Sequence, residues 1–86
     1  MHEASVTQAL LDLVLDKARQ HHASQVNEVR VSVGALSTFI DESVELWWRA
    51  LAADTIAADA KLNFVHDPVS ADCYLMSIDI EPEKAA

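Results

Sequence analysis

The first three residues carry the donor atoms with the clearest metal chemistry in the chain. Met1 offers a terminal amine, His2 an amide nitrogen and an imidazole, and Glu3 a further amide or a carboxylate. These atoms can close adjacent small chelate rings around one ion, and such nitrogen-rich, near-planar sets suit nickel(II) or copper(II) better than magnesium or calcium. Because the amine and amide must lose protons, the affinity is expected to rise with pH. The three residues are therefore the candidate metal ligands, with copper(II) as an open alternative to nickel(II).

Catalytic machinery is scarce in the rest of the chain. With one glycine there is no glycine-rich phosphate loop, and neither a nucleophile elbow nor an HExxH pattern occurs. His21 and His22 are interpreted as residues of a helix C-terminus, and His66 as an edge-strand or loop residue. The single cysteine, Cys73, excludes an internal disulfide and a cysteine-based zinc site within one chain. We expect that the protein is not an enzyme.

Length and charge limit the classes of protein further. The chain of 86 residues suffices for one domain, and no apolar run approaches the roughly 18 residues that cross a bilayer. A formal charge of -8 disfavours a nucleic-acid partner, because no cluster of Lys and Arg is available to release counterions. The same charge is compatible with a basic protein partner. We expect a soluble, cytoplasmic protein without a membrane-spanning segment.

Apolar periodicity predicts two helices. Ser5–Gln8 has the form of a capping box, which places the start of a helix near residue 5. The helical spacing of apolar residues that follows predicts an end near His21. The core-facing stripe of this helix is expected to contain Val6, Leu10, Leu13, Val14, Lys17 and Ala18. Asp41, Glu42 and Glu45 place negative charge where the N-terminus of a second helix favours it. The expected apolar face of that helix consists of Val44, Trp47, Trp48 and Leu51.

Alternation of side chains predicts three strands. Residues expected to share one face of each strand are, in chain order, Val29, Val31 and Val33; Leu62, Phe64 and His66; and Tyr74, Met76, Ile78 and Ile80. Gly34 is expected to end the first strand, and the turn-rich stretch Asp67–Asp72 to join the last two strands as a hairpin. The predicted fold class is α+β, with two helices packed on one face of a three-stranded sheet in the order α-β-α-β-β.

Five segments match the pattern of a known family in the same order. They are Met1–Ser5 (MHEAS), Val29–Val33 with the following Gly34–Ser37 (GALS), Leu46–Trp48, Ala60–Phe64 and Tyr74–Glu81. Together these segments resemble the HypA/HybF hydrogenase maturation proteins, and the similarity covers nearly the whole chain. The MHE start, the G-x-L-S turn and the S-I-x-I-E ending are its most specific parts.

The resemblance implies a nickel metallochaperone that has no enzymatic activity. It implies that Met1, His2 and Glu3 bind Ni(II), which is then handed on through protein partners. Those partners would be a hydrogenase maturation GTPase and the large subunit of nickel-iron hydrogenase, or urease in some organisms. A HypA-like protein-interaction or regulatory module that has lost metal delivery is the alternative function.

The chain departs from the family pattern between its last two strands. Family members insert a zinc ribbon with two C-x-x-C pairs there, whereas this chain runs from His66-Asp67-Pro68 to Cys73-Tyr74 with one cysteine. The resemblance therefore implies a single HypA-like nickel-binding domain over residues 1–86, without the ribbon between about 67 and 73 and without structural zinc. Formation of a homo-oligomer stays open, since a small sheet leaves an unpaired edge.

Overall fold

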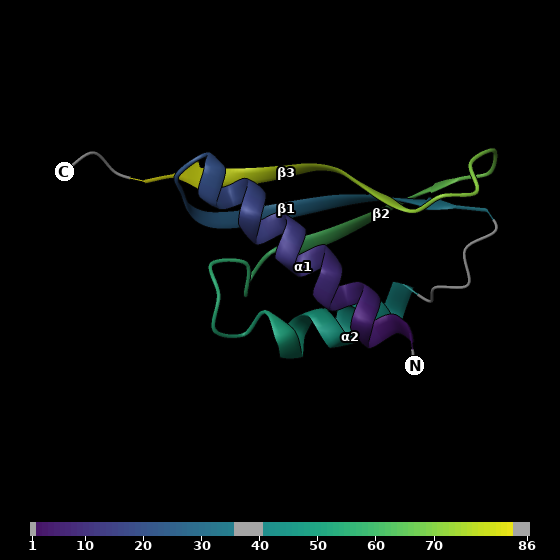
Figure 1. Ribbon diagram of the computed structural model, residues 1–86, viewed down its shortest axis with the longest axis horizontal. Helices are drawn as coiled ribbons and strands as arrows, with labels where there is room; N and C mark the ends of the chain where they lie inside the picture. Colours follow the sequence, from purple (N-terminus) through teal and green to yellow (C-terminus); the bar gives the residue numbers. More distant parts are fainter. Residues whose placement is uncertain (1, 36–40, 84–86) are drawn as a thin grey trace.

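The computed structural model describes residues 2–35 and 41–83, and side chains from Glu3 onward within those ranges. Its elements are, in chain order, α1 (His2–Gln20), β1 (Ala23–Gly34), α2 (Asp41–Leu51), β2 (Lys61–Asp67) and β3 (Tyr74–Pro82), as Figure 1 shows. The order α-β-α-β-β and the single three-stranded sheet confirm the predicted α+β class. Leu36 and Ser37 of the predicted GALS turn lie outside the described residues.

Strand β1 lies at the centre of the sheet, whose strand order is β2-β1-β3. It pairs with β2 in parallel and with β3 antiparallel, so that Val29 has Leu62 on one side and Ile78 on the other. The parallel pair requires a long connection, which α2 and the segment after it provide. The predicted hairpin between the last two strands is therefore wrong. Alternation within a strand defines its faces, but it says nothing about which strand lies beside it.

The chain crosses from β2 to β3 past the end of β1, and Gly34 makes this crossing possible. A Cβ atom at Gly34 would lie 2.6 Å from the carbonyl carbon of Ala71 and 2.7 Å from both Asp72 N and Ser70 O. The Ala35 amide donates a hydrogen bond of 2.8 Å to that same Ser70 oxygen. Gly34 thus ends β1 as predicted, and its role is to allow close backbone approach.

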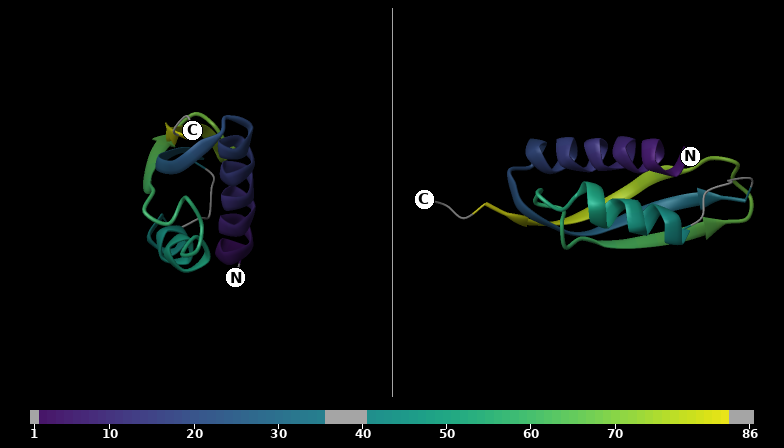
Figure 2. Two further views of the ribbon diagram at one scale, coloured as in Figure 1. Left: turned by 90° about the vertical axis from the view of Figure 1, so that its left-hand side faces the viewer. Right: turned by 90° about the horizontal axis from the view of Figure 1, so that it is seen from below.

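Both helices lie on one face of the curved sheet and enclose a single core with it (Figure 2). The wholly buried Trp48 of α2 is the largest side chain in that core. Its indole Nε1 donates a hydrogen bond of 3.2 Å to the carbonyl of Ala57, which holds the segment after α2 against the helix. A buried indole N–H needs such an acceptor, since an unpaired one would cost about 1–3 kcal/mol.

The buried face of α1 differs from the predicted stripe. Its most buried residues are Thr7, Leu11, Val14 and Ala18. Val14 and Ala18 confirm part of the stripe, but Leu13 is 43% exposed and Lys17 is also exposed. The reason is that α1 packs against α2 as well as against β1 and β3, which rotates its enclosed face away from Leu13.

A β-bulge changes the inward face of β3. Arg30 of β1 pairs with Ser77 whereas the next residue, Val31, pairs with Leu75, so Met76 has no partner on β1. As a result Leu75 packs against the core, and Met76 is 47% exposed. Tyr74 is 53% exposed and contributes to the lining of an apolar pocket. Because of the bulge, the prediction that Tyr74 and Met76 share one face with Ile78 is wrong.

Trp47 is not part of the buried face of α2. It is 43% exposed, whereas the neighbouring Trp48 is 0% exposed. Val44 is buried and Leu51 half-buried, as predicted. Consecutive helix positions differ by about 100°, so both tryptophans could not face the same core equally. Sequence analysis had no signal that would select one of them.

His22, directly after α1, has a positive φ of 53°. Residues with a Cβ atom are disfavoured in this left-handed backbone conformation, and glycine is the usual residue at this position of a helix end. We expect His22→Gly to raise the free energy of unfolding by about 0.5–1 kcal/mol. Urea denaturation measures this change, and His21→Gly is the matched control that should bring no gain. A less stable His22→Gly chain would contradict the prediction.

Candidate metal centre

Helix α1 begins at His2, one turn earlier than the predicted start near residue 5. Ser5 is exposed inside the helix, and the Gln8 side chain donates a hydrogen bond of 2.8 Å to Asp12 Oδ1. The capping-box prediction is therefore wrong, because Gln8 is used one turn further along instead of reaching back to Ser5. This places the backbone of His2 and Glu3 within the first helical turn.

Of the candidate ligands, His2 and Glu3 belong to the first turn of α1. Met1 and the side chain of His2 are outside the described part of the structure, and the Glu3 side chain is half-buried. His2 and Glu3 are the first two residues of α1, so their backbone nitrogens belong to its first turn. The structure leaves the ligand set of Met1, His2 and Glu3 as a prediction.

Thr7 holds the backbone directly behind the candidate ligands. This side chain is 0% exposed, and its Oγ1 donates a hydrogen bond of 2.5 Å to the Glu3 carbonyl. A Thr hydroxyl inside a helix commonly bonds to the carbonyl four residues earlier. The Glu3 carbonyl is thus held by a buried side chain. Thr7 could not be recognised from the sequence, since one threonine in an amphipathic helix gives no signal of this role.

A histidine and a carboxylate meet at the same end of the molecule. Both helices begin there (Figure 1), and Asp41 is the first residue of α2. His66 Nε2 lies 2.6 Å from Asp41 Oδ2, with the two side chains 62% and 34% exposed. The exposed position of His66 on edge strand β2 confirms its interpretation. The pairing with Asp41 depends on the parallel β1–β2 arrangement, which sequence analysis did not predict.

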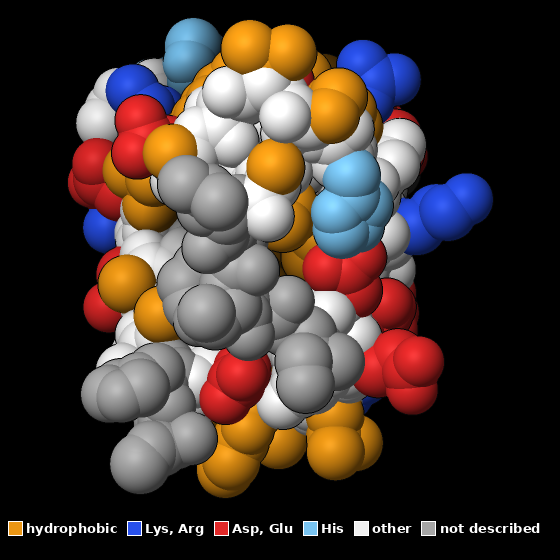
Figure 3. Space-filling model, turned by 90° about the vertical axis from the view of Figure 1, so that its right-hand side faces the viewer, with side chains coloured by type: hydrophobic (Ala, Val, Ile, Leu, Met, Phe, Trp, Pro, Cys, Tyr) orange, Lys and Arg blue, Asp and Glu red, His pale blue; other side chains and the backbone are white. Residues whose placement is uncertain are grey.

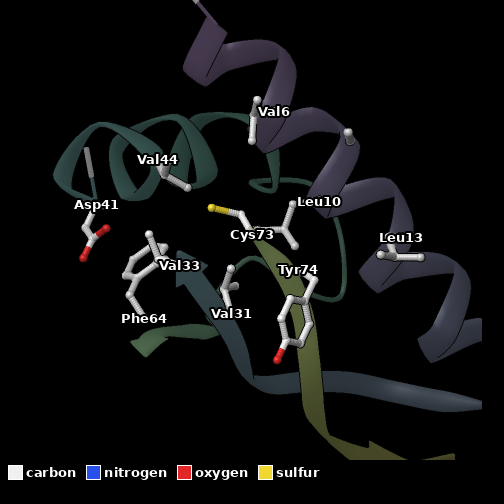
Figure 4. Close-up of a pocket in the computed structure, with 11 residues that line it drawn as sticks. Val6, Leu10, Leu13, Val31, Val33, Asp41, Val44, Phe64, Cys73 and Tyr74 are labelled. Carbon is white, nitrogen blue, oxygen red and sulfur yellow. The ribbon is translucent and has the colours of Figure 1, made fainter. Parts of the chain in front are cut away.

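An apolar pocket of about 210 Å³ lies between the two helices and the sheet. Val6 and Leu10 of α1, Val44 of α2 and Phe64 of β2 line it (Figure 4). The Cys73 side chain points into this pocket in the same view, and it packs against the core as a small apolar residue, as predicted. The pocket provides few polar atoms, so it suits packing better than metal coordination.

The side chains that the structure describes form no cluster of metal ligands. Among side chains 3–35 and 41–83, no group of three or more His, Cys, Asp or Glu stands in a geometry that could hold an ion. His21 and His22 are exposed at the far end of α1, where they were predicted. In the same part of the chain, no helix is long and apolar enough to span a membrane.

Comparisons with known proteins agree with the architecture. The solution structure of the Ni metallochaperone HypA from Helicobacter pylori has a TM-score of 0.84 against this chain at 18% identity. That match covers 96% of this chain and 100% of the other. A second solution structure, of a HypA protein, has a TM-score of 0.77, also at 18% identity. At this level of identity the similarity shows the fold.

Sequence relatives extend the agreement to the family. Hydrogenase maturation factor HypA 2 of Bradyrhizobium diazoefficiens is 36% identical over 81 residues, which are 94% of this chain and 72% of that protein. HypA of Dehalococcoides mccartyi strain CBDB1 is 33% identical over 75 residues, or 87% of this chain and 63% of its own length. The family described as "Hydrogenase/urease nickel incorporation, metallochaperone, hypA" matches residues 1–85. The chain therefore belongs to the HypA family of nickel-incorporation metallochaperones.

Proposed function

We propose that the protein is a nickel metallochaperone for the maturation of nickel-iron hydrogenase. In this proposal one Ni(II) ion binds to the Met1 amine, to His2 and to Glu3, and the ion is the protein's cargo. Membership of the HypA family supports the choice of metal and target. The structural observation that supports the proposal is the hydrogen bond from the buried Thr7 hydroxyl to the Glu3 carbonyl, which holds the backbone at the start of α1 directly behind the proposed ligands.

The helix end also favours the chemistry that chelation requires. Amide nitrogens bind Ni(II) in their deprotonated, anionic form, and the positive end of the helix dipole stabilises that negative charge. Coordination by nitrogen atoms of residues 1–3 is expected to unwind the first turn of α1, at the expense of the hydrogen bonds that the carbonyls of this turn accept. The hydrogen bond from Thr7 to the Glu3 carbonyl keeps the helix intact directly behind that point. Local rearrangement at the ligands thus leaves the core of α1 undisturbed.

Delivery through a maturation GTPase and the hydrogenase large subunit is the second part of the proposal. Two of the relatives are named hydrogenase maturation factors, and the chain spans 72% and 63% of their length. In this chain residues 68–73 alone connect β2 with β3. We propose that this short connection replaces the zinc ribbon of the family, so that no structural zinc is needed, and that residues 1–86 form one domain.

The short connection is also the observation that favours the alternative function. A HypA-like module that lacks the ribbon could retain protein contacts and lose metal delivery. Partner binding would then be independent of His2 and of nickel. Self-association is a further proposal, since β2 and β3 are the two edge strands of the described sheet.

A transfer experiment distinguishes delivery from mere partner binding. The chain is loaded with radioactive nickel and mixed with the purified GTPase and the hydrogenase large-subunit precursor, with His2→Ala as the comparison. We expect nickel to reach the precursor from the parent chain and not from the variant. Capture of the same partners by both chains, with no transfer of nickel by either, would support the alternative module.

Thr7 provides a test of the helix end itself. Thr7→Val keeps the shape of the side chain but removes the hydroxyl that holds the Glu3 carbonyl. We expect nickel affinity to fall about 10-fold, as for other residues that orient metal ligands. Thr7→Ser, which retains the hydroxyl, should restore most of the affinity in a calorimetric titration. Equal nickel affinity in Thr7→Val and the parent chain would show that this hydrogen bond does not support the site.

A further inference from the structure

Helix α2 carries more apolar surface than the core covers. Its inward side is formed by Val44 and Trp48, which are 4% and 0% exposed. Leu46 and Trp47, in contrast, retain 72% and 43% exposure. At about 100° per residue, the outward side of the helix forms a second stripe. This α2 stripe consists of Ser43, Leu46, Trp47 and Ala50.

The surroundings of the α2 stripe are acidic. Glu42 and Glu45 are exposed on the flank of the stripe, and Arg49 is the basic residue of this helix. Its guanidinium donates hydrogen bonds of 3.0 and 2.5 Å to the carbonyls of Ala58 and Ala60, and it lies 3.6 Å from Glu45. Arg49 is thus engaged within its own chain. Figure 3 shows hydrophobic side chains and carboxylates at the lower edge of this end of the molecule, where both helices begin.

The negative charge of the chain limits the kinds of surface that can bind the α2 stripe. At this stripe a second copy would bring the same carboxylates together, and the formal charge of -8 disfavours an anionic membrane surface. A protein surface with Lys and Arg around an apolar centre would match both the exposed side chains and the carboxylates. Tryptophan is among the residues that contribute most to protein interfaces, especially beside an acidic or basic rim.

We propose that the α2 stripe is a docking surface for a basic, amphipathic helix of another protein. Trp47 and Leu46 form its apolar centre, and Glu42 attracts the positive rim of the partner, whereas Glu45 is paired with Arg49. The stripe consists of residues other than Met1, His2 and Glu3. Docking is therefore expected with or without nickel, and its test does not depend on the proposed metal site.

Calorimetry and NMR with a defined probe test this proposal. The probe is a synthetic amphipathic helix of leucine and lysine, and the comparison probe has glutamate in place of lysine. The lysine helix should bind one per chain, with amide shifts centred on α2, and the glutamate helix should not bind. We expect Trp47→Ala to weaken binding about 10-fold or more and Leu46→Ser to weaken it as well. Val69→Ser, at a side chain that is 92% exposed on the β2–β3 connection, is the matched control without effect.

Several outcomes would overturn the proposal. These are equal binding of both probes, binding that Trp47→Ala and Leu46→Ser leave unchanged, shifts centred away from α2, and association of the chain with itself through the stripe. Circular dichroism of the two variants checks that each retains its fold, and Leu46→Ser is informative by itself because that side chain is mostly exposed. His2→Ala should bind the lysine helix like the parent chain, so failure of the nickel site and failure of docking are distinguishable.

Discussion

Replacement of His2 by alanine is expected to abolish stoichiometric nickel(II) binding and to leave the fold unchanged. The variant removes the imidazole from the proposed ligand set, while α1 keeps its buried residues Thr7, Leu11 and Val14. Loss of residues that only orient a ligand costs about 10–100-fold in affinity, so the loss of a ligand itself should cost at least about 100-fold. Isothermal calorimetry measures the change, and circular dichroism confirms that the helices are retained.

Two other histidines provide matched controls for this prediction. His21 and His22 are exposed at the opposite end of α1, so His21→Ala and His22→Ala should leave nickel affinity unchanged. Affinity of the parent chain should rise with pH, because the amine and amide nitrogens release protons on binding. Nickel binding that survives in His2→Ala, or that is lost equally in a His21→Ala chain, would place the metal elsewhere.

Replacement of Gly34 by alanine is expected to have the largest effect on stability. The added Cβ would lie within 2.6–2.7 Å of three backbone atoms of the Ser70–Asp72 crossing. Backbone atoms cannot move aside as a flexible side chain can, so either β1 or the crossing segment must shift. We expect a loss of about 3 kcal/mol, at the upper end of the range for overpacked positions. This is a large share of the ~5–15 kcal/mol that stabilises a typical domain.

Urea denaturation of Gly34→Ala checks this expectation. Ala35→Ser at the next, exposed position is the matched control, and its free energy of unfolding should change by less than about 0.5 kcal/mol. A Gly34→Ala chain as stable as the parent would show that the β2–β3 connection does not pass over the end of β1.

The elements of the fold could be predicted from local patterns, whereas their neighbours in space could not. Period-two alternation around Val29–Val33 and helical spacing around Val44 and Trp48 are properties of each segment alone. The position of β1 between β2 and β3 depends on long-range pairing, so the hairpin prediction failed. The prediction for Met76 failed for a related reason, because the position of a bulge depends on the pairing with the neighbouring strand.

The candidate site shows the same difference between what local patterns predict and what depends on long-range contacts. Met1, His2 and Glu3 could be proposed from donor chemistry and from the family resemblance, since the three residues are consecutive. The roles of Thr7 and of the His66–Asp41 pair depend on the start of α1 and on the parallel pairing of β2. Ser5–Gln8 was a misleading signal, because the side chain that would complete a capping box bonds to Asp12 instead.

Nickel titration of two chains that differ only ahead of Met1 tests the central claim most directly. One chain begins at Met1 with a free amine, and the other carries an additional Gly-Ser before it, which removes that amine from the chelate ring and leaves His2 and Glu3 in place. The proposed site predicts about one nickel ion per chain in the first case and loss of that binding in the second. Equal nickel affinity and stoichiometry in the two chains would contradict a site built on Met1, His2 and Glu3.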